Sequence, residues 1–174
     1  MAAAQKTTAA PLPAKLASLL REARWLVLAA LAGYLLLIFL SFDRADPGWS
    51  HSATASAMHN AGGRAGAWIA DLLLYLFGLS AYWWVALCLA GVAWGYRSLD
   101  RSVLIDRRPL AIALGGFALL LLSSASIEAL RLHSLAAELP LAPGGLAGAA
   151  IGGFAASLLG FTGATLLLLA LAAA

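Results

Sequence analysis

Apolar residues are grouped along this chain in long blocks, separated by short polar segments. Four blocks are almost wholly apolar, at residues 25–42, 67–95, 109–127 and 144–174. A helix needs about 20 apolar residues to cross a hydrocarbon core of roughly 30 Å. Because each block reaches or approaches this length, the pattern predicts an all-α membrane protein with four transmembrane helices.

The residues ahead of the first block fall into two parts. Residues 1–14 are rich in Ala, Thr, Gln and Pro without an apolar period, so we interpret them as a disordered cytoplasmic tail. Residues 15–24 carry Leu16, Leu19 and Leu20 on one helical face, which is typical of an amphipathic helix at the membrane surface. No A-x-A cleavage site follows the first block, so we expect a retained span and not a signal peptide. Residues 25–174 then form the four-span membrane domain.

The second and fourth blocks are longer than one crossing requires. Counting back from Arg97, a crossing reaches about residue 72, so we expect an outer extension before it and a bend at Gly78 and Ser80. The fourth block is rich in Gly and Ala first and in Leu afterwards, which places the crossing from about Gly152 onward. The predicted spans are therefore residues 25–42, 72–95, 109–127 and 152–172.

Composition agrees with lipid as the solvent of this chain. Hydrophobic residues make up 63% and charged residues 11%, with a mean hydropathy of +0.89. Soluble domains are about half apolar and a quarter charged. A nucleic-acid-binding protein needs a clustered basic face, and no basic cluster here exceeds four residues, so we expect this part to contact no nucleic acid.

The positive charges predict the orientation of the helices. Short cytoplasmic loops of membrane proteins carry an excess of Lys and Arg. The first polar segment and the loop between the second and third spans hold eight of the eleven cations, namely Lys6, Lys15, Arg21, Arg24, Arg97, Arg101, Arg107 and Arg108. The other two loops hold the remaining three, Arg44, Arg64 and Arg131. Four spans with both the N- and the C-terminus in the cytoplasm satisfy this distribution.

Asp71 is the first candidate for chemistry because it stands in an apolar block. An ionisable residue within the membrane suggests ion or proton passage, so one hypothesis is a small transporter or channel that uses Asp71. The length of the block, however, places Asp71 near the outer interface. We therefore prefer the interpretation that Asp71 caps or hydrogen-bonds neighbouring backbone.

Small residues recur at every fourth position of the last block. The stripe consists of Gly144, Gly148, Gly152, Ala156, Gly160 and Ala164, and Gly91 and Gly95 form a separate G-x-x-x-G. Such stripes allow helix backbones to approach closely in lipid. Packing within one chain and association of subunits explain the pattern equally well.

No motif in the chain supports a catalytic or metal site. His51, His59 and His133 lie in the predicted external loops at a spacing that suits metal ligation poorly. A phosphate-binding loop needs a lysine after its glycines, and no lysine follows Lys15. We expect no catalytic residue, metal or cofactor here, and an enzyme that uses the histidines is the weakest alternative.

Several short motifs resemble the N-terminal membrane region of the FtsK/SpoIIIE family of bacterial DNA translocases. The motifs are DPGWS at residues 46–50, NAGGRAGAWIAD at 60–71, FGLSAY at 77–82 and GGLAG at 144–148. They mark five candidate residues at the membrane interface, namely Asn60, Gly62, Gly66, Asp71 and Gly78. The resemblance extends over nearly the whole chain from Lys15 onward.

The resemblance implies a function that the residues alone do not. FtsK-like proteins carry four spans, a linker and a cytoplasmic RecA-like motor, which uses ATP and magnesium to pump DNA as a hexamer. The resemblance further implies the bacterial inner membrane at the division septum, self-association, and contacts with division proteins such as FtsQ, FtsL and FtsI. Because the chain stops after its last span, we expect the motor to lie outside it, and this part to be a non-enzymatic anchor that couples cell division to chromosome segregation.

Overall fold

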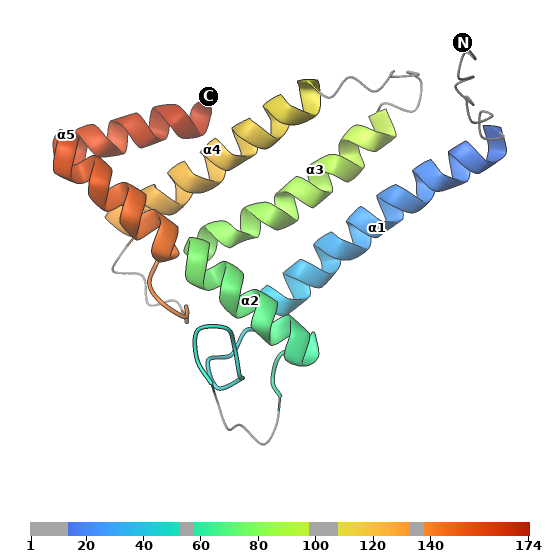
Figure 1. The fold of residues 1–174 in the computed structure, drawn as a ribbon, viewed down its shortest axis with the longest axis horizontal. Helices are drawn as coiled ribbons and strands as arrows, with labels where there is room; N and C mark the ends of the chain where they lie inside the picture. The colour runs from blue at the N-terminus through green and yellow to red at the C-terminus, as the bar shows by residue number, and fades with distance from the viewer. Residues whose placement is uncertain (1–13, 53–57, 98–107, 133–137) are drawn as a thin grey trace, which may run out of the picture.

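The computed structural model describes residues 14–52, 58–97, 108–132 and 138–174, and every regular element in these ranges is helical (Figure 1). In chain order the elements are α1 (Ala14–Leu40), α2 (Gly63–Phe77), the 3₁₀ helix η1 (Gly78–Tyr82), α3 (Trp83–Arg97), α4 (Arg108–Arg131) and α5 (Gly145–Ala173). Four stretches are long and apolar enough to cross a membrane: Glu22–Leu40, Gly63–Trp94, Leu110–Arg131 and Gly145–Ala173. The predicted all-α fold with four spans is confirmed.

In Figure 1, α1, α3 and α4 lie along roughly the same direction, whereas α2 and the first half of α5 lie at an angle to them. α1 packs on α3, and α4 packs on α5. The start of α1, the end of α3, the start of α4 and the end of α5 lie at one end of the molecule, which we call the terminal end (Figure 1). The opposite end, the loop end, consists of residues 41–52, 58–62 and 138–144. Both α2 and the first half of α5 start from this loop end.

α1 is a single helix that begins well before the first apolar block. Its backbone is helical without a break from Ala14 to Leu40, so the predicted surface helix over residues 15–24 and the first span are continuous. Whether residues 15–24 lie on the membrane surface stays a prediction.

The second apolar stretch is bent at Gly78, which confirms the bend predicted at Gly78 and Ser80. Gly78 has φ 61° and ψ −142°, a conformation that is open essentially to glycine alone, and η1 connects it to α3. The predicted start of this span, residue 72, falls inside α2 and marks no change in the backbone.

The last two helices differ in extent from the predicted spans. α4 continues to Arg131, one helical turn beyond the predicted end of the third span at residue 127, and the position of that membrane boundary stays a prediction. In α5 the change of direction occurs at Gly160, with φ 68° and ψ 169°. Gly152, where the last crossing is predicted to begin, is buried within the helix, and the start of that crossing stays a prediction.

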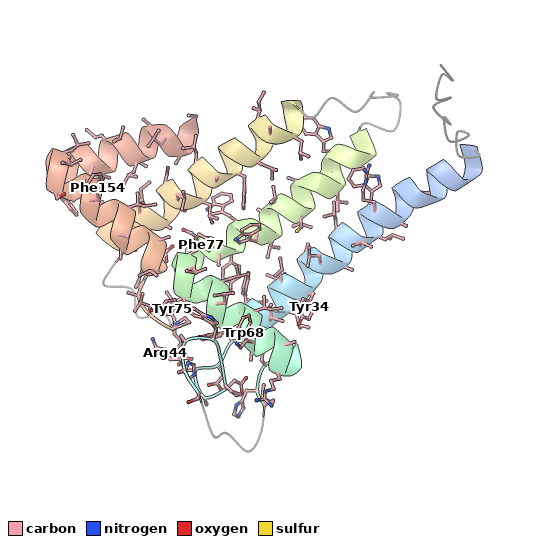
Figure 2. The ribbon with its side chains drawn as sticks, in the orientation of Figure 1. Tyr34, Arg44, Trp68, Tyr75, Phe77 and Phe154 are labelled. Carbon is pink, nitrogen blue, oxygen red and sulfur yellow. The ribbon has the colours of Figure 1, made fainter. Side chains whose placement is uncertain are left out.

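The core lies between α1, α2, η1 and α3 and is built from side chains of modest size. Its buried members are Ala32, Leu35, Ile38, Phe39, Ala70, Leu74, Ala81, Val85, Cys88 and Leu139. The outer surface is also apolar: Leu26, Ile112 and Phe154 are 71%, 76% and 67% exposed, and Figure 2 shows Phe154 on the outside of α5. A surface of this kind suits contact with lipid chains and not with water.

Candidate functional site

Asn60 joins the end of α1 to the start of α2. Its side-chain amide donates to the carbonyl oxygens of Ile38, at 2.9 Å, and of Ser41, at 3.3 Å. Its Oδ1 accepts a hydrogen bond from the backbone N–H of Gly62 at 2.9 Å. The last carbonyls of a helix have no partner within the helix, so this buried amide satisfies groups that would otherwise be costly in lipid.

Gly62 and Gly66 allow α2 to cross α1 at close range. A Cβ atom at Gly62 would overlap Cγ2 of Ile38, and one at Gly66 would lie 2.8 Å from the same atom and 2.7 Å from Oδ1 of Asn60. Larger residues at either position would push the two helices apart. These two glycines are thus packing residues at the loop end.

Asp46 organises the polypeptide between α1 and α2. Its buried carboxylate accepts hydrogen bonds from the backbone N–H groups of His59, at 2.9 Å, and Asn60, at 2.7 Å, and lies 3.3 Å from Nδ1 of His59. Burial alone would raise the pKa of Asp46, but the hydrogen bonds from His59 and Asn60 outweigh it and the pKa is lowered.

Acid should therefore destabilise the loop end. Because the pKa of Asp46 is below its ordinary value of 3.8, its carboxylate contributes stability at neutral pH that is lost as pH falls through the lowered pKa. The thermal midpoint of the protein in detergent should decline below about pH 4 more steeply than that of Asp46→Asn. Identical pH profiles for the two proteins would contradict this role of Asp46.

Asp71 holds a loop against α2. The carboxylate is 1% exposed, and its two oxygens accept hydrogen bonds from the backbone N–H of Ser50, at 2.5 Å, and from the Ser50 hydroxyl, at 2.9 Å. A Cβ atom at Gly48 would lie 2.5 Å from Cγ of Asp71, so the loop approaches closely. Beside it, Trp49 packs edge-on against Tyr75, which Figure 2 labels on α2, with ring centroids 5.3 Å apart. Both oxygens of Asp71 are occupied in anchoring the loop, and this geometry gives no support to an ion path.

Replacing Asp71 with Asn should cause a moderate loss of stability, of about 1–2 kcal/mol, because one acceptor for Ser50 remains. Asp71→Ala should cost more, since both donors of Ser50 would then lack their acceptor. Glu138→Gln is the control, because Glu138 is an exposed carboxylate at the same end of the molecule. Unfolding of the three variants in detergent gives the comparison. Loss of an ion flux in Asp71→Asn vesicles without loss of stability would instead favour transport.

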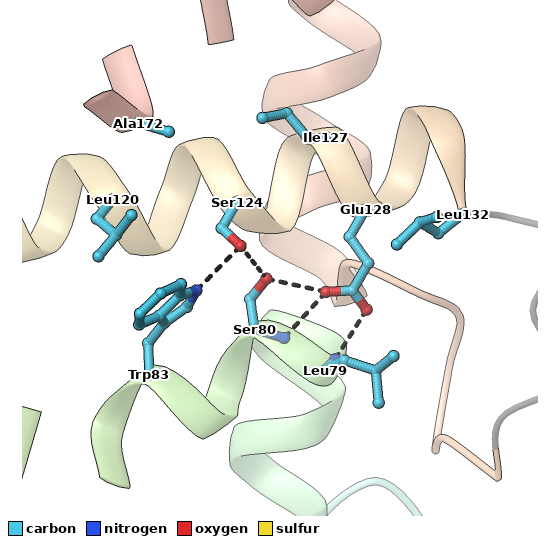
Figure 3. Close-up of a pocket in the computed structure, with 9 residues that line it drawn as sticks. All are labelled: Leu79, Ser80, Trp83, Leu120, Ser124, Ile127, Glu128, Leu132 and Ala172. Atoms are coloured by element: carbon cyan, nitrogen blue, oxygen red, sulfur yellow. Dashed lines mark hydrogen bonds between the residues drawn. The ribbon is translucent and has the colours of Figure 1, made fainter. Parts of the chain in front are cut away.

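Glu128 forms a second buried polar centre, which Figure 3 shows between η1 and α4. Its carboxylate accepts hydrogen bonds from the backbone N–H groups of Leu79, at 2.8 Å, and Ser80, at 2.9 Å, and from the Ser80 hydroxyl at 2.9 Å. The sequence pattern did not predict this site, because Glu128 lies just beyond the predicted end of the third span. The available signal was Ser124, one helical turn earlier on the same face of α4.

The hydrogen bonds around Glu128 form a directed chain. The indole of Trp83 can only donate, and it donates to the Ser124 hydroxyl at 3.1 Å. Ser124 in turn lies 2.9 Å from the hydroxyl of Ser80, whose proton is directed to Glu128. The chain lines a hollow of about 360 Å³ whose walls are mostly apolar (Figure 3). Each of the four side chains in this hydrogen-bonded series has a partner, so the cluster is a structural junction between α3 and α4.

The glycine stripe of α5 is used for packing within the chain. A Cβ atom at Gly148 would overlap the carbonyl oxygen of Ala125, and one at Gly152 would lie 3.0 Å from the carbonyl oxygen of Ser126. Gly144 likewise approaches Ala125 and Ala129. These three glycines bring α5 against the backbone of α4, as the interpretation of packing within one chain expects.

The remaining packing candidates differ from one another. The prediction that Gly160 packs as part of the stripe is wrong. Its φ of 68° breaks the helix, and a Cβ atom there would meet no other atom within 4 Å. Gly91 faces α1, since its Cβ would lie 3.3 Å from Cδ1 of Leu28. Gly95 is in α3, but its surroundings lie outside the described residues.

Gly78 lies where the half of the molecule built from α1, α2 and α3 meets the half built from α4 and α5. A Cβ atom there would overlap the backbone nitrogen of Gly144 and lie 2.6 Å from Oε1 of Glu128. The guanidinium of Arg44 also bridges the halves by donating to the carbonyl oxygen of Leu139. The end of α2 and the start of α5 therefore meet.

The described residues contain no group of three His, Cys, Asp or Glu side chains placed to hold a metal ion. His51 bonds the carbonyl oxygen of Arg44 through Nε2 at 2.8 Å, and His59 lies 3.6 Å from the carboxylate of Asp43. His133 lies outside the described residues. The two described histidines thus support the loop.

The comparison with known proteins agrees with the arrangement of four spans. The profile of the family described as the 4TM region of DNA translocase FtsK/SpoIIIE matches residues 17–174. This chain belongs to that family. It is 46% identical to DNA translocase FtsK 2 of Ralstonia nicotianae over 94% of the chain and 22% of that protein. Its identity to DNA translocase FtsK 1 of Neisseria meningitidis serogroup A is 34%, over 90% of the chain and 20% of that protein.

A third FtsK relative, from Shewanella oneidensis, is 35% identical over 86% of the chain and 16% of its own length. No solved structure matches the chain. The chain thus spans about a fifth of the length of these FtsK translocases and represents their four-helix membrane region.

Proposed function

We propose that this chain is the membrane-anchoring and septum-localising region of an FtsK-like DNA translocase. The observation that carries the proposal is the family match over residues 17–174, combined with a fold in which buried Asp46, Asn60, Asp71 and Glu128 hold loops and helices together. In this function the helices provide an anchor in the bacterial inner membrane, and their packing and their contacts with division proteins couple cell division to chromosome segregation.

ATP hydrolysis and DNA translocation belong, in this proposal, to the rest of the protein. The FtsK relatives are about five times longer than the matched region, so most of their length lies beyond it. ATP and magnesium would bind in that other part.

The proposed orientation places the terminal end in the cytoplasm. The start of α1 and the end of α5 lie at the same end of the molecule, which supports both termini being on one side of the membrane (Figure 1). The uneven distribution of the eleven Lys and Arg residues supports the cytoplasm as that side. Alkaline phosphatase, which needs an oxidising compartment for its disulfides, should be active when inserted after Ser52 and inactive after Ala174. The reverse pattern would overturn the orientation.

The proposed partners are further copies of the chain and other division proteins, including FtsQ, FtsL and FtsI. The glycines of α5 that face α4 are already occupied, so self-association would have to use other surfaces. The loop end, held in shape by Asp46, Asn60 and Asp71, offers a defined surface to such proteins.

A chimera tests the proposed function. Residues 1–174 should replace the matched region of the Ralstonia FtsK 2 relative and keep cells dividing, because the fold and the loop end would be equivalent. A chimera with an unrelated four-span membrane protein is the control and should give filamentous cells. Filamentation with residues 1–174, at equal membrane abundance, would contradict the proposal.

A further inference from the structure

Two segments of the chain repeat each other in sequence. Residues 62–78 read GGRAGAWIADLLLYLFG, and residues 144–160 read GGLAGAAIGGFAASLLG. The two segments align without a gap, and eight of their 17 positions are identical. Four of the identical residues are glycines at the same spacing. This shared spacing predicts that the two segments have a similar backbone conformation.

The backbone repeats with the sequence. Gly63 and Gly145 start the two helices with φ of 64° and 59°, and Gly78 and Gly160 break them with φ of 61° and 68°. Each segment follows a long helix, α1 or α4, and crosses it closely through a glycine at the equivalent position. Each half of the molecule therefore consists of a long helix, a crossing arm (residues 63–77 or 145–159), a glycine break and a second limb (α3 or residues 161–173).

The two breaks differ in what surrounds them. At Gly78 there is no free space, and Glu128 accepts hydrogen bonds from the next two backbone N–H groups, those of Leu79 and Ser80. At Gly160 a Cβ atom would meet no other atom within 4 Å. No side chain among the described residues accepts a hydrogen bond from the backbone directly after Gly160. The first break is fixed by its neighbours, and the second is not.

One contact between the second limb of α5 and α4 is made by Arg131. Its Nε donates to the Thr165 hydroxyl at 3.2 Å, and its guanidinium lies 4.2 Å from the centroid of the Phe161 ring. Ala164 and Leu168 are also buried there. Burial of apolar side chains gives little driving force between helices in lipid, because lipid chains replace the lost contacts. The exposed Arg131 adds a polar contact to the packing of this limb on α4.

We propose that Gly160 is the hinge of this membrane region, about which residues 161–173 change their angle while the rest of the fold stays fixed. Arg131 favours the observed angle without fixing it, whereas the equivalent break at Gly78 is fixed by its neighbours. Under the proposed function, residues 161–173 connect the anchor to the motor, so the hinge lets the two parts reorient. Only this consequence rests on the proposed function.

Distances between spin labels in lipid nanodiscs test the hinge. In a Cys88→Ala background of the full chain, one pair at Ile112 and Leu169 spans Gly160, and a control pair at Leu40 and Leu89 spans Gly78; all four side chains are exposed. We expect a broad distance distribution for the first pair and a narrow one for the control. Arg131→Gln should broaden or shift the first pair alone. Equal widths, or no effect of Arg131→Gln, would overturn the hinge.

A matched pair of glycine variants provides the second measurement. Gly160→Ala should straighten α5, because alanine strongly disfavours the observed backbone conformation, and should shift the Ile112–Leu169 distance to one longer, narrow value. Gly153→Ala, at an exposed helical position with open space, should leave the distances unchanged. An unchanged distance in Gly160→Ala would refute the hinge. Since these readings need no division partner, a failed hinge and a failed septal function remain distinguishable.

Discussion

Glu128→Ala should lower the free energy of unfolding by about 3 kcal/mol or more. The carboxylate accepts from three donors, the N–H groups of Leu79 and Ser80 and the hydroxyl of Ser80. A buried donor that loses its acceptor costs about 1–3 kcal/mol. The loss should therefore affect the junction between the two halves of the molecule and not only α4.

Two variants separate this effect from a general effect of removing charge. Glu128→Gln keeps one acceptor oxygen and should show an intermediate loss. Glu138→Ala removes an exposed carboxylate from the loop that follows α4 and should be neutral. Denaturation in mixed micelles gives the three values. Equal stability of Glu128→Ala and Glu138→Ala would show that the hydrogen bonds of Glu128 do not hold the junction.

Gly148→Leu should be nearly as damaging, with a loss of about 3 kcal/mol, because overpacking a close contact displaces backbone. Even a Cβ atom at this position overlaps the carbonyl oxygen of Ala125 on α4. The whole of α5 would have to move away from α4, which also disturbs the meeting point of Gly144 with Gly78. We expect a lower unfolding midpoint and faster proteolysis of the folded protein in detergent.

The control for this prediction lies five residues further along the same helix. Gly153 is exposed with open space around it, so Gly153→Leu should keep the stability of the parent protein. Size-exclusion chromatography with light scattering measures the oligomeric state. It therefore distinguishes packing within one chain from association of subunits as the role of the glycine stripe. Normal stability of Gly148→Leu, accompanied by loss of oligomers, would assign the stripe to subunit association and contradict the packing described above.

The four spans could be predicted from the sequence because lipid imposes a minimum length of apolar residues, which hydropathy measures directly. The bend at Gly78 could be predicted for the same reason, because the second apolar block was too long for one straight crossing. Gly160 was missed because it fell in register with the small-residue stripe. A stripe shows which residues share a helical face only if the helix continues, and here the helix breaks.

The polar contacts could not be predicted, because each joins residues that are distant in sequence. Asp71 binds Ser50 from 21 residues away, and Glu128 binds Ser80 from 48 residues away. Asn60 was identified only through the resemblance to FtsK, which marked its position without indicating its partners. Local pattern assigned Glu128 to a loop, although the start of η1 needs its carboxylate.

The central claim is that these residues anchor and position an FtsK-like translocase at the division septum. Fluorescence microscopy of dividing cells that express residues 1–174 fused to a fluorescent protein tests it most directly. We predict a band of fluorescence at the constriction, retained in Gly153→Leu and lost or reduced in Gly148→Leu. Uniform fluorescence around the cell envelope, from an intact and correctly oriented fusion, would contradict the account.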